Sequence, residues 1–322
     1  MIGIRVIKTA VAVVIAIYLA EYFDLNTPFS AGLFAVLGLG ATLKGGIKNS
    51  MIRIMASLVG LFLAALIFFL FGYHIWVIGI FVLVVFSLLA RLKLQDGIVS
   101  STVVMLHLFS LHSVTTLHIM NEVYLLLIGL GLSTLINLTY MPDEQPKLDK
   151  IRSNLEELLS RIFKEFSFHL IDNIHHIWDG KELLQAYDTI EQGNQLAERA
   201  ADNKLYQGNS YWVRYFEMRR QQLDSTQRML GIIAQVYQTV PHALEIARLF
   251  EELSEEVKSE YYGGIVEKHL SELEIDFKKY PLPTTNEEFE VRSALQQLSV
   301  ELKNYLSIAK RSKKRKKPLE SL

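Results

Sequence analysis

One apolar segment of the chain, between Ile98 and Leu117, carries many polar side chains. His107 lies near its midpoint, and Ser100 and Ser110 share a helical face with it through spacings of seven and three residues. An imidazole inside a membrane can exchange protons near physiological pH and so couple transport to proton movement. The alternative is a neutral histidine that donates one hydrogen bond to a neighbouring helix.

Cations at the ends of other apolar segments suit a different task. Lys8, Arg53 and Arg91 would line a funnel for an anionic substrate on the cytoplasmic side. Orientation of the helices and extension to the lipid interface already explain their positions. Asn137 lies within the last apolar segment, where it either faces a cavity or bonds to a neighbouring helix.

Membrane-spanning helices are the elements that must position these residues. Between Arg53 and Arg91 lie 37 residues without a formal charge. As a helix they would measure about 55 Å, almost two membrane thicknesses, so we expect a hairpin that breaks at residues 71–74. We predict six spans, of which the second is short and rich in glycine, within residues 6–23, 26–42, 54–71, 74–90, 98–117 and 123–140.

The charges of this half predict its orientation. The first 140 residues contain only seven Lys or Arg, at alternate gaps between the apolar segments, and the other gaps carry acids such as Glu122 or no charge. Short loops rich in Lys and Arg stay in the cytoplasm. Residues 1–141 are therefore predicted to form a multi-pass domain of the plasma membrane, with both termini of the chain in the cytoplasm. The seven cations are Arg5, Lys8, Lys44, Lys48, Arg53, Arg91 and Lys93.

Three stretches of this half resemble one family of membrane proteins. They are Gly3–Ala10, the short segment from Ala31 to Thr42, and the helix start from Lys48 to Gly60. In these stretches the chain resembles the aromatic acid exporter family, and its six-span half followed by a helical domain is similar to the small Gram-positive members. The resemblance implies efflux of aromatic or related organic acids. Larger relatives carry additional spans, so it also implies a homo-oligomer, most simply a dimer.

Residues 147–309 are predicted to form a cytoplasmic all-α bundle. Apolar residues recur there at spacings of three and four, which is typical of amphipathic helices. Residues 141–309 contain 19 Lys or Arg against 29 Asp or Glu, so this body is acidic. No nucleophile–base pair, metal-ligand set or phosphate-binding glycine loop is recognisable, and the chain has no cysteine, so we predict no enzyme, cofactor or metal site. The main helices are expected over residues 151–166, 181–201, 211–240, 242–262 and 286–309.

A basic tail follows as residues 310–322, with seven cations among the eight residues from Lys310 to Lys317. Attraction to anionic lipid headgroups is worth about 1 kcal/mol per basic residue near the surface. The residues predicted to bind membrane lipids are Lys313, Lys314, Arg315, Lys316 and Lys317. The alternatives are docking onto an acidic patch of the bundle or of a neighbouring subunit, and a solvated tail. Nucleic acid is not an expected partner, because the tail follows an acidic, membrane-bound domain.

Two functions of different classes are compatible with the sequence. The first is a secondary exporter of aromatic or other small organic acids, in which the spans form the pathway. The second is a membrane-anchored regulatory or interaction protein, in which the spans are a scaffold for the cytoplasmic helices. No residue of the sequence specifies a substrate, so the choice between them requires the structure.

Overall fold

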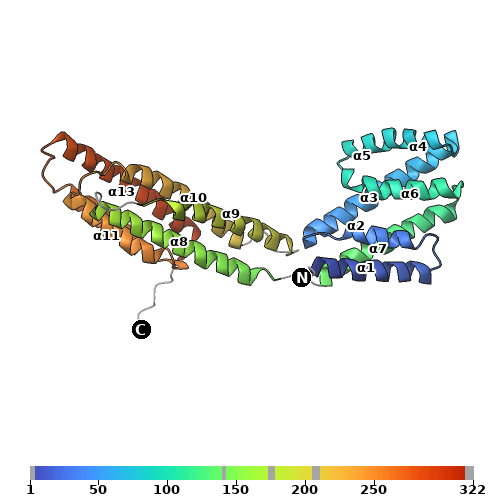
Figure 1. Ribbon diagram of the computed structural model, residues 1–322, viewed down its shortest axis with the longest axis horizontal. Coiled ribbons are helices and arrows are strands. Elements are labelled where there is room, and N and C mark those ends of the chain that lie inside the picture. The colour runs from blue at the N-terminus through green and yellow to red at the C-terminus, as the bar shows by residue number, and fades with distance from the viewer. Residues whose placement is uncertain (1–3, 140–142, 173–177, 205–210, 316–322) are drawn as a thin grey trace. The chain divides into compact units, whose positions relative to one another are not determined.

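The computed structural model describes residues 4–139, 143–172, 178–204 and 211–315, and nearly all of their regular structure is α-helical (Figure 1). The prediction of an all-α chain is therefore confirmed. The helices before residue 142 form one compact unit and those after it form the other. Each unit has its own hydrophobic core, and each is described here by itself.

The first unit consists of helices that run back and forth between its two ends. The connections α1–α2, α3–α4 and α6–α7 lie at one end, and α2–α3 and α5–α6 lie at the other (Figure 1). A π-helical segment, η1 (Val82–Phe86), joins α4 to α5, and a 3₁₀ turn, η2 (Gln95–Gly97), precedes α6. The helices are α1 (Ile4–Tyr22), α2 (Phe29–Gly38), α3 (Leu43–Phe71), α4 (Ile75–Phe81), α5 (Ser87–Arg91), α6 (Ile98–Leu111) and α7 (Thr116–Thr139).

Small residues let these helices approach one another closely. A Cβ atom added to Gly38 of α2 would overlap the hydroxyl of Ser133 in α7. In the same way, a Cβ atom added to Gly60 of α3 would overlap the hydroxyl of Ser101 in α6. The short α2 packs against α1 and α7, and α3 packs against α6 and α7. Close contacts between small residues are the usual means of packing helices in lipid.

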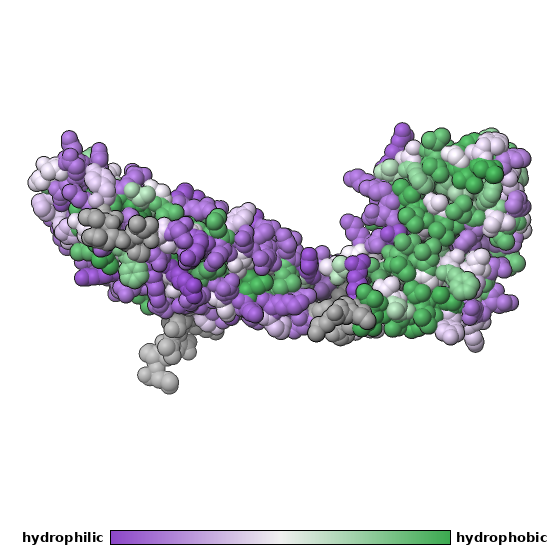
Figure 2. Space-filling view, in the orientation of Figure 1, coloured by the Kyte–Doolittle hydropathy of each residue, from purple (hydrophilic) through white to green (hydrophobic). Residues whose placement is uncertain are grey.

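Apolar side chains dominate the surface of the first unit (Figure 2). Phe69, Ile75 and Leu83 have exposed fractions of 85%, 81% and 74%. Soluble monomers rarely expose apolar patches of this extent. Among the described residues, α3 and α7 are long and apolar enough to cross a membrane. At 10 and 14 residues, α2 and α6 measure about 15 and about 21 Å, less than a hydrocarbon core of about 30 Å.

The boundary between the last two apolar helices differs from the prediction, which places it between Leu117 and Val123. Helix α6 ends at Leu111, because His112 adopts a left-handed conformation with a φ of 47°. Helix α7 already begins at Thr116. Glu122 therefore lies inside a helix and not in a loop. His107 consequently lies in the last turns of α6 and not at the midpoint of a span.

The second unit is a bundle in which α8 packs along α11 and α10 along α13. Phe163, Phe250 and Tyr305 meet in its core with ring centroids 5.2 to 6.0 Å apart. The hydroxyl of Thr285 accepts a hydrogen bond from the Glu288 N–H and so caps the N-terminus of the last helix. The helices are α8 (Gln145–Ile171), α9 (Lys181–Asp202), α10 (Tyr211–Ile233), α11 (Pro241–Glu256), α12 (Ile265–Phe277) and α13 (Asn286–Ser312).

The basic run begins inside the bundle and not after it. Helix α13 continues to Ser312, and Lys310 in its last turn pairs with Glu267 of α12 at 2.8 Å. The next residues, Lys314–Arg315 (β2), pair in parallel with Tyr261–Tyr262 (β1). The described part of the basic run therefore contacts the bundle through an ion pair and through backbone pairing. Lys316 and Lys317 lie outside the described residues.

Candidate functional site

A buried carboxylate is the centre of a polar cluster in the first unit. Glu122 lies near the start of α7, with only 1% of its side chain exposed. Its Oε2 lies 2.8 Å from Nδ1 of His107, and its Oε1 accepts a hydrogen bond of 3.2 Å from the side-chain amide of Asn121. Both carboxylate oxygens thus have a partner. Such pairing is what permits a charged group to remain inside an apolar bundle.

His107 connects this carboxylate to α2. Its Nε2 lies 2.9 Å from the hydroxyl of Ser30, in the first turn of α2, and its side chain is 17% exposed. When Nδ1 donates to Glu122, a neutral ring is left with Nε2 as an acceptor for the Ser30 hydroxyl. Ser30, His107 and Glu122 therefore form a hydrogen-bonded chain that runs from α2 through α6 to α7.

Asn121 ties the same cluster to the connection between α1 and α2. Its Oδ1 accepts a hydrogen bond of 2.8 Å from the backbone N–H of Asn26. Its amide nitrogen lies 3.3 Å from the carbonyl of Asn26 and donates to it. The connection also contains Thr27, whose φ is positive at 56°. The two hydrogen bonds between the Asn121 side chain and the backbone of Asn26 hold this strained loop next to Glu122.

The arrangement can hold a proton and pass it along. An imidazole between a hydroxyl and a carboxylate accepts a proton at one ring nitrogen while it donates at the other. The same order of groups activates the serine of many hydrolases. In an apolar helix bundle, ionisable residues that face the interior typically mark ion and proton pathways. The cluster lies at the end of the unit that carries the α1–α2 and α6–α7 connections (Figure 1).

The other predicted polar residues do not reach this cluster. Ser110 is exposed, and its hydroxyl donates to the carbonyl of His107 in its own helix. Asn137 is 3% exposed, and its amide donates to the carbonyl of Thr42 at 3.2 Å. Asn137 thereby holds α7 to the connection between α2 and α3. Asn137 was predicted either to face a cavity or to bond to a neighbouring helix, and the structure shows a bond to the residue that precedes α3.

The predicted cations lie at the opposite end of the unit. Arg91 is exposed at the end of α5, and Lys8 is partly buried in the second turn of α1. Arg53 of α3 packs against Gly97, and its Nε and Nη1 are buried without a hydrogen-bond partner among the described residues. The structure therefore does not join the three cations to His107.

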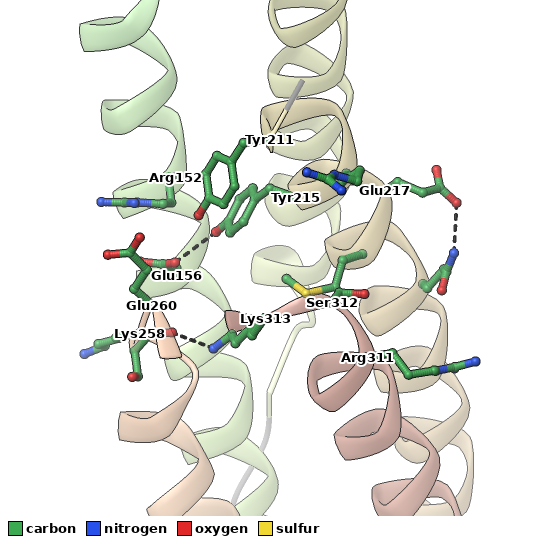
Figure 3. A pocket seen from close by; sticks show the side chains of 14 residues that line it. Arg152, Glu156, Tyr211, Tyr215, Glu217, Lys258, Glu260, Arg311, Ser312 and Lys313 are labelled. Carbon is green, nitrogen blue, oxygen red and sulfur yellow. Dashed lines mark hydrogen bonds between the residues drawn. The ribbon is translucent and has the colours of Figure 1, made fainter. Parts of the chain in front are cut away.

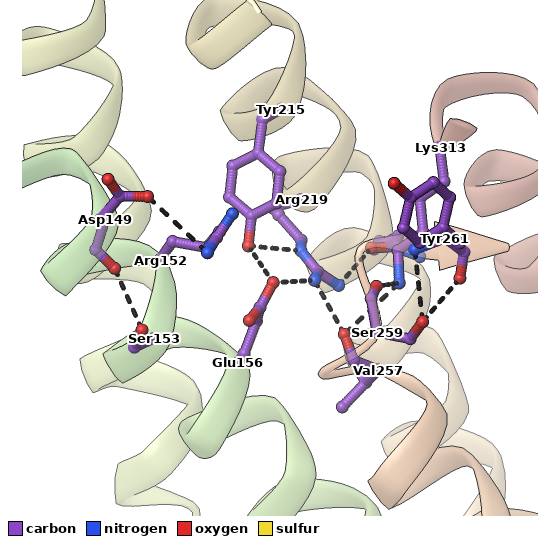
Figure 4. A network of polar contacts seen from close by, with 11 residues as sticks. Asp149, Arg152, Ser153, Glu156, Tyr215, Arg219, Val257, Ser259, Tyr261 and Lys313 are labelled. Atoms are coloured by element: carbon purple, nitrogen blue, oxygen red, sulfur yellow. Dashed lines mark hydrogen bonds and ion pairs between the residues drawn. The ribbon is translucent and has the colours of Figure 1, made fainter. Parts of the chain in front are cut away.

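The second unit contains its own buried charge, Arg219 of α10 (Figure 4). Its Nη2 donates to the Glu156 carboxylate at 3.0 Å and to the Val257 carbonyl at 2.9 Å. Its Nε donates to the hydroxyl of Tyr215 at 3.0 Å, and that hydroxyl donates to Glu156 at 2.9 Å. Burial raises the pKa of Tyr215, so its hydroxyl stays protonated. The network joins α8, α10 and the end of α11.

Lys313 points into this network (Figure 4). Its amino group donates to the carbonyl of Ser259 at 2.6 Å and to that of Val257 at 3.4 Å. Burial, assisted by the charge of Arg219, lowers the pKa of Lys313 to about 7. In the described structure this member of the predicted lipid-binding run is therefore occupied by the bundle.

A pocket of about 490 Å³ lies beside the network (Figure 3). Its walls come from α8, from the first turns of α10, from residues 258–260 and from the end of α13. Arg152, Tyr211 and Lys313 are among the side chains that line it. The size is within the usual range of small-molecule sites, about 300–1,000 Å³.

Two family models match the chain and together cover almost all of it. "Aromatic acid exporter family member 1" matches residues 1–141, and "Putative aromatic acid exporter C-terminal domain" matches residues 145–310. The chain belongs to the aromatic acid exporter family. The resemblance found in the sequence is therefore confirmed, and the family is one of exporters, not of enzymes.

Relatives and a solved structure are similar to the chain over different lengths. It is 34% identical over 307 residues to "Uncharacterized protein YqjA" of Bacillus subtilis, with 95% of both chains covered. It is 23% identical over 279 residues to "UPF0421 protein OB2406" of Oceanobacillus iheyensis, which covers 84% of this chain and 79% of that protein. A "putative membrane protein from Clostridium difficile 630" aligns with a TM-score of 0.46 and 19% identity, over 51% of this chain and 98% of that one.

Several residues of these sites are missing from the candidates of the sequence analysis, among them Glu122 and Arg219. The sequence analysis places Glu122 in a loop, whereas α7 begins at Thr116 and six of its residues precede Glu122. Arg219 follows Tyr215 by four residues and Trp212 by seven, on the apolar face of α10. An arginine at core spacing was a readable signal of a buried ion pair.

Proposed function

We propose that the chain is a secondary exporter of aromatic or other small organic acids, which works in the plasma membrane as a homo-oligomer, most simply a dimer. Membership of the exporter family supports this substrate class. The observation that carries the proposal is the Glu122–His107 pair in an apolar unit. Burying two ionisable groups among lipid-facing helices is costly, and such groups are retained where they handle ions or protons.

In the proposed topology the first unit crosses the membrane six times, with both of its ends in the cytoplasm. Its seven cations lie at the end that carries the α2–α3 and α5–α6 connections, whereas Glu21, Asp24 and Glu122 lie at the other. The positive-inside rule assigns the cationic end to the cytoplasm. Helices α2 and α6 are shorter than the hydrocarbon core, as interrupted spans that line transport cavities often are.

This topology gives the two ends different tasks. An organic anion approaches from the cytoplasm, where Lys8, Arg53 and Arg91 attract it. Arg53 is the best placed to receive a carboxylate, because its buried Nε and Nη1 lack partners among the described residues. The Glu122–His107 pair lies near the outer end and takes up a proton from outside. Proton entry then drives the anion outward.

Inside-out membrane vesicles with an acidic lumen test this proposal. Radiolabelled benzoate that diffuses as the neutral acid collects on the alkaline side, so accumulation in the acidic lumen requires a carrier. Vesicles that contain the wild-type chain are expected to accumulate benzoate, and Glu122→Gln and His107→Gln are expected to reduce the initial rate at least about tenfold, in line with the loss of a proton-transfer group. Immunoblots of the membranes check that each variant inserts.

Matched controls carry the same chemical change outside the cluster. Glu21→Gln and His74→Gln alter exposed residues at the same end of the unit and should leave the rate unchanged. Unchanged accumulation in Glu122→Gln would remove the cluster from the mechanism. If the wild-type chain accumulates neither benzoate nor other aromatic carboxylates above empty vesicles, the export proposal fails and the regulatory function gains support.

A further inference from the structure

We propose that the pocket of the second unit is a binding site for a planar aromatic carboxylate. The proposal concerns α8, α10, α13 and the connection after α11, and it does not depend on transport by the first unit. The pocket is about 490 Å³ in volume, which suits a molecule of one ring with its substituents.

Aromatic and polarizable side chains form one side of the pocket (Figure 3). The rings of Tyr211 and Tyr215 lie 6.1 Å apart and are inclined by 30° to each other. Tyr211 is 40% exposed and lines the pocket. The thioether of Met218 lies in the same wall. Such a surface binds a flat ring by offset stacking and sulfur–aromatic contact.

Positive charge outweighs negative charge around this wall. The carboxylate of Glu156 already accepts hydrogen bonds from the fully buried Arg219 and from Tyr215. The carboxylate of Glu217 is turned away from the pocket toward Gln221, from which it accepts a hydrogen bond (Figure 3). Glu260 is the third carboxylate that lines the pocket. Five cations line it among the described residues, of which Lys258 already pairs with Glu157 and Glu255: Arg152, Arg214, Lys258, Arg311 and Lys313.

Two of these cations are suited to hold a carboxylate beside the tyrosine wall. Arg214 is exposed and forms no ion pair with another described residue. Arg152 lies 3.7 Å from Asp149, and it also interacts with Glu156 and with the hydroxyl of Tyr211, which places its guanidinium beside the tyrosine wall. A guanidinium binds a carboxylate through two parallel hydrogen bonds. Helix α10 begins at Tyr211, so the positive end of its dipole also lies at the pocket.

The ligand would connect the bundle to the start of the basic tail. Lys313 lines the pocket, and the next two residues pair with β1. An anion held by Arg152 and Arg214 would therefore lie between α8, α10 and the segment that follows α13. The site is thus placed to report the concentration of an organic acid to the cytoplasmic end of the chain.

Isothermal titration calorimetry of the full-length chain in detergent tests the site, with salicylate as the probe and empty micelles as the blank. Salicylate is expected to bind saturably. Cyclohexanecarboxylate has the same charge without a flat ring, and inorganic phosphate has charge without a ring, so both should bind at least about tenfold more weakly if stacking contributes as expected. Phosphate that binds as tightly as salicylate would overturn the proposal in favour of a general anion site.

Variants localise the binding. Tyr211→Ala and Arg214→Gln should each weaken salicylate at least about tenfold, because each removes one of the two recognition elements. The exposed Arg214 makes its variant informative even if Tyr211→Ala fails to fold. Arg161→Gln removes an exposed arginine of α8 outside the pocket and should bind as the wild type does. Wild-type affinity in both pocket variants would overturn the proposal.

One further variant separates this site from the export pathway. Glu122→Gln is expected to lose export and to keep full salicylate binding, because the pocket lies wholly in the second unit. If Glu122→Gln abolishes binding while the pocket variants retain it, the ligand binds in the first unit, and the inference drawn here is wrong. A failure of the vesicle assay alone leaves the calorimetric result untouched.

Discussion

Arg219 and Glu156 form an ion pair inside the second unit, with 3.0 Å between Nη2 and Oε1. The side chain of Arg219 is fully buried, whereas that of Glu156 retains 12% exposure. The guanidinium also bonds to Tyr215, Gln222 and the carbonyl of Val257, so three elements depend on one side chain. A buried pair of this kind adds little net stability, but it fixes which helix faces meet.

Removal of Arg219 is expected to be strongly destabilising. Arg219→Ala leaves Glu156 and the Val257 carbonyl without their donor, and breaking a buried pair typically costs about 3–5 kcal/mol. Arg219→Lys should recover only part of this, because an ammonium cannot reproduce the fork of donors. Thermal unfolding of the purified chain measures both. The adjacent Arg220 is the control, because it pairs with Glu191 and both side chains are half exposed. Arg220→Ala should reduce the free energy of unfolding by less than about 1 kcal/mol.

Lys313 should make the stability of the second unit depend on pH. Its pKa is lowered to about 7 in the folded chain, from 10.5, chiefly by burial and then by Arg219, against the opposing charges of Glu156 and Glu256. Between these values the unfolded chain binds more protons, so stability rises with pH, by at most about 1.4 kcal/mol per pH unit. Below pH 7 both states are protonated and the slope vanishes.

The variant Lys313→Met isolates this contribution. Melting temperatures of wild type and variant, measured at intervals from pH 6 to pH 10, should differ by a constant amount up to about pH 7. Above about pH 7 the melting temperature of the wild type should rise relative to that of the variant. Both chains share every other titrating group. A change with pH in the difference between their melting temperatures therefore reports on Lys313 alone. A difference that stays constant up to pH 10 would show that the amino group is not held in the bundle.

Close packing of α3 on α6 should make Gly60 intolerant of substitution. The added methyl group of Gly60→Ala overlaps the hydroxyl of Ser101, and overpacking typically costs about 1–3 kcal/mol. The second change Ser101→Gly should restore the loss. Gly131 of α7 has no atom within 4 Å of an added Cβ, so Gly131→Ala should be neutral or stabilising by up to about 1 kcal/mol. Thermal stability in detergent distinguishes the three variants.

The sequence predicted which segments are helical better than where the helices end. Periodicity and turn residues are local, so they located α8 to α11 and α13. The end of α6 depends on the conformation of one residue, His112, whose positive φ has no clear signature in sequence. In the same way α10 ends at Ile233, not at Val240, because the following turn buries Val236 in the core.

The candidate site was predicted in part for a related reason. His107 stood out because polar residues are rare in apolar segments, and a local rule was enough to find it. Its partners Ser30 and Glu122 lie 77 and 15 residues away, and only the packing of α2, α6 and α7 brings them together. Contacts of this kind depend on tertiary structure, which no local pattern encodes.

The coupling between His107 and Glu122 can be measured through stability, independently of transport. His107→Leu removes the partner of a carboxylate that is 1% exposed, and an unpaired buried charge is expected to cost about 3–5 kcal/mol. In a background that already carries Glu122→Gln, the same substitution leaves no charge behind and should cost much less. The double-mutant cycle is therefore expected to give a coupling of about 2–3 kcal/mol. Additive effects would mean that the two side chains do not interact in the folded chain, and the proton relay built on their contact would then have no basis.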